Sequence, residues 1–232
     1  MAEKMTKRAK RRDREDGLMR TVSQHHFQHA GSSQLLTISC SEVMQEEYGL
    51  YVWPCSIVLA EYVWQNRLRF AGARVVELGA GTALPGIVAA KVGAIVVLTD
   101  REDQPQVFEN MQKTCDLNQV SCEMQGLTWG QWNEKSFALR HPAQIVLGAD
   151  VLYASKDFDD LLATVKFLLQ GMPDSVFITT YQPRSGHRSI EYLMAKWGLQ
   201  CTQLLDAADF LPASKLSALS NSVELIEIRS QD

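Results

Sequence analysis

Short apolar runs of strand length recur along the central part of the chain. Five of them, rich in β-branched residues, span residues 74–80, 94–100, 121–127, 143–150 and 175–181. Between them lie segments with a helical spacing of apolar positions, at 85–92, 103–118, 156–170 and 187–197. Nearly continuous apolar strands that alternate with helices predict a parallel sheet covered on both faces.

The two ends of this pattern depart from the alternation. Residues 201–207 and 222–229 are apolar runs with no helical pattern between them, so we expect an antiparallel pair at one edge of the sheet. A strand-like run at 35–43 and an apolar helix at 55–68 precede the alternating region. The sequence therefore predicts an α/β fold: a doubly wound, mostly parallel, Rossmann-like sheet of seven strands with an antiparallel strand at one edge.

Composition limits the class of protein. The 232 residues are 46% hydrophobic, enough for one substantial core, and no Pro/Gly/Ser linker divides them. No apolar stretch approaches the roughly 18 residues of a membrane span, so we expect a soluble intracellular monomer with no membrane contact. The five cysteines are an odd, scattered set without a CxxC pair, which argues against a disulfide framework and a zinc site.

Charge is distributed unevenly along the chain. Residues 1–16 contain seven Lys/Arg and four Asp/Glu, which leaves 16 basic and 23 acidic residues in the remainder. We divide the chain into a basic, disordered arm (1–24) and a folded domain (25–232). The run from Lys7 to Arg12 is typical of a nuclear import signal, so we expect nuclear and cytoplasmic protein, although a merely solvated arm is the alternative. Direct nucleic-acid binding is not favoured, because nothing else in the chain is basic with interleaved aromatics.

The stretch VVELGAGTALPG (75–86) supplies the candidate chemistry. Gly79 and Gly81 follow the first strand of the alternating region, where backbone approaches a ligand most closely. A P-loop lysine is missing, and Leu84 occupies the position of the third glycine of a dinucleotide fingerprint. Glu77 precedes the glycines and would repel a pyrophosphate but attract a cation, so the loop favours a cationic ligand without phosphates.

A second acid indicates that this ligand also contains a sugar. Asp100 ends the next strand, 19 residues after Gly81, where a carboxylate accepts hydrogen bonds from a ribose diol. A ribose joined to a cationic, phosphate-free group describes S-adenosylmethionine. The alternative is that Glu77 and Asp100 are ordinary polar residues at strand ends.

The HHFQH segment (25–29) is a candidate metal-binding site because it is rich in histidine. His25 and His29 are spaced for one helical turn, but no carboxylate or cysteine partner stands nearby. We therefore expect no bound metal.

An ordered set of motifs resembles the seven-β-strand methyltransferases, and more narrowly family 16 of the protein methyltransferases. The motifs are YGLYVWPCSIVLAEY (48–62), VVELGAGTALPGIVAA (75–90), the acid of LTD (98–100), LTWG (127–130) and LGADVLY (147–153). The resemblance covers Phe27 to Ile228 and implies an S-adenosylmethionine-dependent enzyme.

Residue by residue, the resemblance implies a set of cofactor contacts. Trp53 lies near the methionine part, Glu77, Gly79 and Gly81 line the amino acid end, Asp100 takes the ribose hydroxyls, Trp129 packs beside the adenine, and Ala149 approaches through its backbone. An indole suits a purine because it offers a flat apolar surface and an N–H donor. The alternative is that Trp53 and Trp129 are core aromatics.

The DVLY stretch implies the acceptor side. In the family this D-x-x-Y position borders the acceptor, so Asp150 and Tyr153 are the candidate catalytic residues. Asp150 can accept a hydrogen bond from a lysine or arginine nitrogen and stabilise the cation that remains after transfer. Tyr153 can line the channel, while a helix cap is the structural alternative for Asp150.

The acidic domain favours a basic protein substrate. The resemblance implies methylation of an arginine of histone H3, slightly ahead of lysine, although the paired glutamates with which other arginine methyltransferases hold the guanidinium are missing. Two other functions stay open: a small-molecule methyltransferase, and a catalytically silent cofactor-binding partner protein. An NAD-dependent dehydrogenase is disfavoured by Glu77 and by the missing third glycine.

Overall fold

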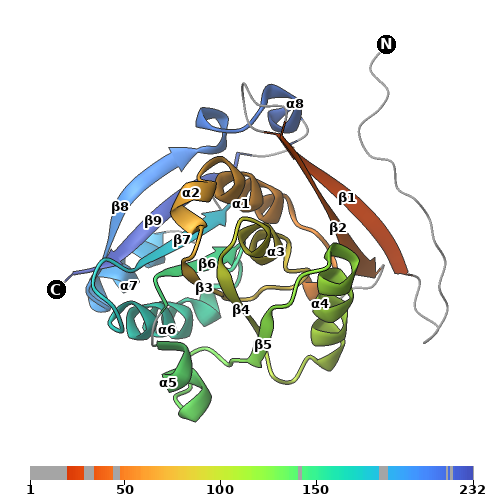
Figure 1. The fold of residues 1–232 in the computed structure, drawn as a ribbon. Coiled ribbons are helices and arrows are strands. Elements are labelled where there is room, and N and C mark those ends of the chain that lie inside the picture. Colours follow the sequence, from red (N-terminus) through yellow and green to blue (C-terminus); the bar gives the residue numbers. More distant parts are fainter. Residues whose placement is uncertain are drawn as a thin grey trace.

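A seven-stranded sheet forms the centre of the molecule (Figure 1). The computed structural model describes residues 20–28, 34–43, 48–140, 143–182, 188–217, 219 and 222–231. The strands are β3 (Arg74–Glu77), β4 (Ile95–Asp100), β5 (Glu123–Gly126), β6 (Ile145–Ala149), β7 (Val176–Tyr181), β8 (Leu199–Asp206) and β9 (Glu224–Ser230).

The strand order is β5-β4-β3-β6-β7-β9-β8. The first five strands are mutually parallel, and β9 pairs antiparallel with both β7 and β8. The predicted fold class, with its antiparallel pairing at one edge, is therefore confirmed. Because the chain order reverses between β3 and β6, a crevice is expected beyond the carboxyl ends of these two strands.

Helices cover both faces of the sheet (Figure 1). The longer helices are α1 (Pro54–Gln65), α3 (Leu84–Lys91), α4 (Pro105–Asn118), α5 (Glu134–Arg140), α6 (Phe158–Leu169) and α7 (Arg188–Lys196). Short helical segments are η1 (Tyr48–Leu50), α2 (Arg67–Phe70), η2 (Ser155–Asp157), η3 (Ala207–Asp209) and α8 (Ala213–Leu216).

The sheet separates the two largest clusters of the hydrophobic core. Val75 packs with the cluster that contains α1, α3 and α4, whereas its neighbour Val76 packs with the cluster of α5, α6 and α7. Successive residues of a strand point to opposite faces, so a strand buried on both sides reads as a continuous apolar run. This explains why the strands were visible in the sequence.

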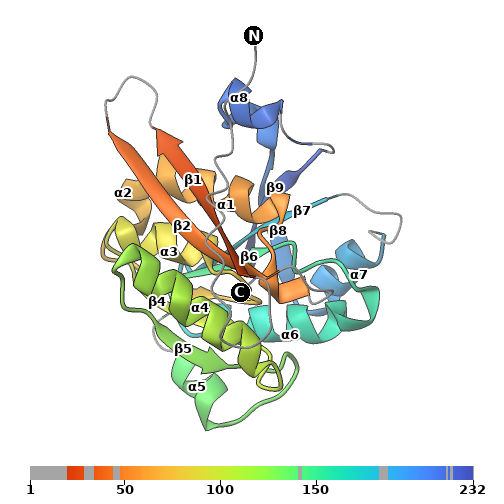
Figure 2. The ribbon, with the colours of Figure 1, turned by 90° about the vertical axis from the view of Figure 1, so that its right-hand side faces the viewer.

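An antiparallel hairpin precedes the sheet and lies beside α4 (Figure 2). It consists of β1 (Arg20–Gln28) and β2 (Leu35–Val43). The strand-like run at 35–43 was predicted, but β1 was not, because its sequence RTVSQHHFQ is mostly polar. Strand β1 also begins inside the range assigned to the basic arm, since residues 20–24 pair with β2. Residues 1–19, including Lys7 to Arg12, lie outside the described part of the chain.

Polar side chains of α4 fasten the outer edge of β2. The amide of Asn118 accepts from the Ser39 N–H at 2.9 Å and donates to the Ser39 carbonyl at 2.7 Å. One turn earlier the Thr114 hydroxyl accepts from the Ser41 N–H, and two turns earlier the Asn110 amide donates to the Ser41 carbonyl. Residues four apart lie on one helix face, so this stripe satisfies backbone groups that an edge strand otherwise leaves unpaired.

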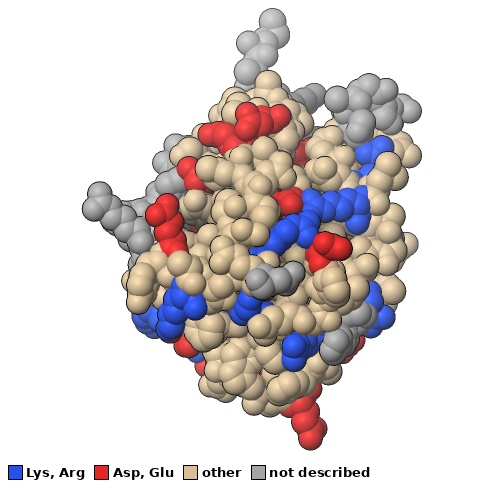
Figure 3. All heavy atoms as spheres, turned by 90° about the vertical axis from the view of Figure 1, so that its left-hand side faces the viewer, with Lys and Arg blue, Asp and Glu red and all other residues tan. Residues whose placement is uncertain are grey.

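Charged side chains are mixed over the face shown in Figure 3, where small basic groups lie among acidic ones. Within the described ranges, no helix combines the length and hydrophobicity needed to cross a membrane.

Candidate active site

A cavity of about 600 Å³ opens at the carboxyl ends of β3, β4 and β6. Its lining comes from five stretches of chain, within residues 49–56, 79–82, 100–103, 127–131 and 149–160. Eight predicted site residues contribute to this lining: Trp53, Gly79, Gly81, Asp100, Trp129, Ala149, Asp150 and Tyr153. The fold thus brings together residues that are up to 100 positions apart in sequence.

The glycine loop forms one wall of the cavity in a conformation that side chains disfavour. Gly79 and Gly81 have φ values of +58° and +53°, in the left-handed region. A Cβ on Gly81 would lie 3.2 Å from the Gly49 carbonyl oxygen, and one on Gly79 would lie 3.1 Å from Val151. Both positions therefore need glycine for backbone conformation and for space.

Asp100 closes the bottom of this loop. One carboxylate oxygen accepts from the Gly81 N–H at 2.9 Å and the other from the Arg101 N–H at 2.8 Å. Burial raises the pKa of Asp100 above its ordinary value, while these two backbone donors oppose the rise. Each oxygen retains a lone pair beyond its backbone bond, which is the acceptor set that a vicinal diol requires.

Glu77 lies outside the cavity lining, beneath the loop. Its carboxylate accepts from the Gly86 N–H at 2.9 Å in the first turn of α3. Burial raises the pKa of Glu77 to about 8, against the opposing Gly86 bond. A Cβ on Gly86 would collide with this carboxylate, which explains the glycine at that position. Contact of Glu77 with the cofactor stays a prediction.

Aromatic side chains form other parts of the wall. Trp53 is the N-cap residue of α1, and its ring meets Tyr51 edge to face with centroids 5.5 Å apart. Trp129 is half-buried and packs against the cluster of α5, α6 and α7. Both indoles line the cavity and also touch apolar neighbours. Each ring can therefore face a cofactor on one side and pack against the protein on the other.

The acceptor candidates follow β6. Asp150 has a φ of +55°, and its N–H donates to the Thr180 carbonyl at 2.8 Å. Few residues other than glycine adopt this left-handed region, and aspartate is among those that do so most readily. Tyr153 lies three residues further and is 46% exposed at the cavity. Ala149, the last residue of β6, precedes Asp150 and also borders the cavity.

These residues fit the parts of S-adenosylmethionine. Trp129 and Leu127 offer an apolar surface for a purine, Asp100 offers acceptors for a ribose diol, and the glycine loop offers exposed backbone. The cavity volume is within the range of small-molecule sites.

Sequence reasoning missed several lining residues. Gly49 and Tyr51 belong to the same YGLYVWP stretch as Trp53, and Thr82 follows Gly81. Their positions within the motifs that resemble the methyltransferase family are the sequence feature that could have identified them. Among the described residues no group of His, Cys, Asp and Glu is arranged to hold a metal. His25 lies in β1 beside Ser23, and His29 is outside the described residues.

Sequence comparisons agree with this chemistry. A family model described as lysine methyltransferase matches residues 32–195. A histone-arginine methyltransferase, METTL23, of Xenopus laevis is 47% identical over 172 residues, covering 74% of this chain and 73% of the relative. Its counterpart of Mus musculus is 40% identical over 195 residues, covering 82% and 77%. The protein N-lysine methyltransferase METTL21A of Mus musculus is 40% identical over 124 residues, covering 50% and 54%.

Solved structures with low sequence identity share the fold. A putative RNA methyltransferase from Pyrococcus horikoshii superimposes with a TM-score of 0.59 at 14% identity, covering 83% of this chain and 93% of that one. An S-adenosylmethionine-dependent methyltransferase from Clostridium acetobutylicum gives 0.57 at 8% identity, covering 75% and 92%. These structures show the shared fold, whereas the family resemblance seen in the sequence is confirmed by the family model and the histone-arginine methyltransferase relatives.

Proposed function

This chain belongs to the lysine methyltransferase family and is an S-adenosylmethionine-dependent protein methyltransferase, and we propose that its acceptor is an arginine side chain of a basic protein, with histone H3 as the candidate. One comparison supports arginine ahead of lysine. The histone-arginine relatives match at 40–47% identity over about three quarters of the chain, whereas the lysine-specific relative matches over 50% of it.

The arrangement around Asp150 carries the proposal. S-adenosylmethionine supplies a methyl group already activated by a sulfonium, so the protein has mainly to orient the acceptor nitrogen. Asp150 borders the cavity after β6, with a left-handed φ of +55° and its N–H bonded to the Thr180 carbonyl. Its carboxylate would accept a hydrogen bond from the incoming guanidinium. As the N–CH3 bond forms and the S–CH3 bond breaks, S-adenosylhomocysteine would leave and one N–H proton would pass to solvent, so that Asp150 would face a methylguanidinium monocation.

The neighbouring side chains complete this acceptor side. Tyr153 and Tyr51 are both substantially exposed and line the same cavity. The face of a tyrosine ring attracts a cationic side chain. On the cofactor side we assign the amino acid end to Gly79 and Gly81, the ribose to Asp100, and the aromatic surfaces to Trp53 and Trp129.

Mass spectrometry tests the acceptor. Core histones and a cell lysate are incubated with methyl-deuterated S-adenosylmethionine and the native protein, or with Gly79→Arg, whose side chain would collide with Val151 and Trp129. Deuterated methyl-arginine on histone H3 with the native protein alone is the expected result. Label on lysine alone would contradict the arginine proposal. No protein label despite cofactor binding would favour a small-molecule acceptor or a silent binding protein.

A matched pair of aspartates isolates the role of Asp150. Asp150 and Asp174 both have left-handed φ values, of +55° and +65°, but only Asp150 borders the cavity. Asp150→Asn is expected to lower kcat by about 100-fold while leaving cofactor affinity intact. Asp174→Asn should retain native kcat. Equal kcat in both variants would remove Asp150 from the chemistry.

Nuclear and cytoplasmic location remains part of this proposal. A histone acceptor requires access to the nucleus, and the basic run from Lys7 to Arg12 is the candidate signal. A fluorescent fusion is expected to lose nuclear accumulation when these basic residues are replaced by serine. Unchanged nuclear accumulation would exclude the run as the signal.

A further inference from the structure

Glu42 links the N-terminal hairpin to the cavity wall. It is the penultimate residue of β2, and its side chain is buried, with 6% of the residue exposed. The carboxylate accepts a hydrogen bond from the Val52 N–H at 3.1 Å. Val52 stands between Tyr51 and Trp53, both of which line the cavity.

The segment that receives this bond is held from a second direction. Gly49 borders the cavity, and its carbonyl oxygen lies against Gly81, where an added Cβ would come within 3.2 Å. The chain from Gly49 to Trp53 is therefore wedged between the end of β2 and the glycine loop. A shift of Val52 away from Glu42 would move Tyr51 and Trp53 relative to Gly81.

Docking of the hairpin does not itself require Glu42. The polar stripe of α4, Asn110, Thr114 and Asn118, already fastens β2 at Ser39 and Ser41. A buried carboxylate is costly unless it is hydrogen-bonded, and an apolar residue would fill the same space without that cost. The buried carboxylate of Glu42 is therefore explained by its hydrogen bond with the Val52 N–H rather than by attachment of the hairpin.

We propose that Glu42 is a positioning residue of the cofactor site, which fixes the Tyr51–Trp53 wall through the Val52 N–H. It acts through Val52, since Glu42 itself is not among the residues that line the cavity. The β1–β2 hairpin is accordingly a functional part of the enzyme. This inference depends on cofactor binding alone and is independent of which acceptor is methylated.

The test compares Glu42→Leu, Glu42→Gln and Thr114→Val in the full chain. The affinity for S-adenosylmethionine is measured by titration calorimetry, and the free energy of unfolding by urea denaturation. Glu42→Leu is expected to weaken cofactor binding about tenfold, and Glu42→Gln, whose amide oxygen can accept the same bond, to stay within about twofold of native. Thr114→Val removes a hydrogen bond of the α4 stripe, so it should lower stability with native cofactor affinity.

Two results would overturn the inference. One is native cofactor affinity in Glu42→Leu. The other is an equal loss of affinity in Thr114→Val, because any loosening of the hairpin would then suffice. If Glu42→Leu does not fold, Glu42→Asp replaces it, since the shorter side chain retains the charge but falls short of Val52. Native affinity in Glu42→Asp would then overturn the inference in the same way.

Discussion

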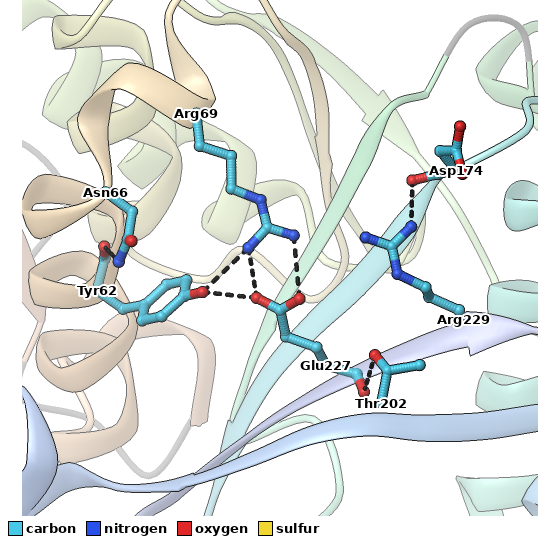
Figure 4. Close-up of polar contacts among 7 residues, drawn as sticks. All are labelled: Tyr62, Asn66, Arg69, Asp174, Thr202, Glu227 and Arg229. Atoms are coloured by element: carbon cyan, nitrogen blue, oxygen red, sulfur yellow. Dashed lines mark hydrogen bonds and ion pairs between the residues drawn. The ribbon is translucent and has the colours of Figure 1, made fainter.

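Two buried glutamates on the same sheet have opposite environments. Glu77 ends β3 beneath the cavity loop, and its carboxylate is bonded to the Gly86 N–H, so burial raises its pKa to about 8. Glu227 lies on β9, which with the outermost strand β8 forms one edge of the sheet (the β9 edge), and Arg69 and the Tyr62 hydroxyl donate to it there (Figure 4). Burial also acts to raise the pKa of Glu227, but the Arg69 ion pair and the hydrogen bonds hold it below its ordinary value.

The difference separates a structural region from a functional one. At the β9 edge the charge of Glu227 is matched within the protein, so the cluster fastens α1 and α2 to the sheet without any ligand. At the cavity end Glu77 and Asp100 accept hydrogen bonds from backbone N–H groups. Removing a partner at the β9 edge should therefore affect stability, whereas changes at the cavity loop should affect cofactor binding.

The largest expected effect is on stability at the β9 edge. Arg69→Met leaves the carboxylate of Glu227, which is 5% exposed, without its cation. Because an unpaired buried charge is costly, we expect a loss of about 3 kcal/mol in the free energy of unfolding, measured by urea denaturation. The double variant Arg69→Met/Glu227→Gln should recover part of that loss. A weakened affinity of the folded single variant for S-adenosylmethionine would break the separation between the two regions.

An intermediate effect is expected in the glycine loop. Gly81→Ala and Gly72→Ala both place a side chain at positive φ, +53° and +75°, so each should lose about 1 kcal/mol of stability. Only at position 81 does the new Cβ press on neighbouring backbone, because nothing lies within 4 Å at position 72. Calorimetry should show cofactor binding weakened about tenfold or more in Gly81→Ala alone. Equal affinities in the two variants would indicate that the loop tolerates a side chain.

The smallest expected effect is the pH dependence of stability. The folded-state pKa of Glu77 is above its unfolded value, so the folded state binds more protons and stability falls as pH rises toward about 8. His25, whose pKa is lowered to about 4 by burial and Lys215, acts in the opposite direction below its unfolded value. Between pH 6.5 and 8 the Glu77 contribution should dominate, at up to about 1 kcal/mol per pH unit.

The variant Glu77→Gln checks this dependence, because its amide oxygen can still accept the Gly86 bond while carrying no charge. Urea denaturation at several pH values should show a flatter profile than that of the native protein. Glu227 gives the converse behaviour: its pKa is lowered, so its contribution is present at neutral pH and is lost only in acid. Native and variant profiles of equal slope would mean that Glu77 is not the group that titrates.

Much of the fold was predictable because its signals are local. Strands buried on both faces show as apolar runs, and the helices between them show a helical spacing. The glycine loop and Asp100 were predictable for a related reason. The end of a parallel strand places its next residues at the ligand edge of the sheet, so chain position alone assigns them to the site.

Other features were decided only by tertiary structure. Strand β1 has a polar sequence and acquires its pairing from β2, and helix α5 was not recognised. The sequence predicted Glu77 beside the loop, but in the structure its carboxylate accepts a hydrogen bond from the Gly86 N–H in the first turn of α3. Glu42 is hydrogen-bonded to Val52 of the cavity wall, 10 residues later in the sequence, and Arg69 to Glu227, 158 residues later.

The sequence by itself thus determined the alternation of buried strands and their longer covering helices, the family, and the position of the glycine loop and Asp100 at the carboxyl end of the sheet. The tertiary structure decided that Glu227 pairs with the Arg69 cation, that Glu77 is hydrogen-bonded to a backbone N–H, and that Glu42 holds the cavity wall through Val52. The physical reason is that periodicity and strand position are properties of neighbouring residues. The partner of a buried charge, in contrast, is fixed only when distant segments pack together.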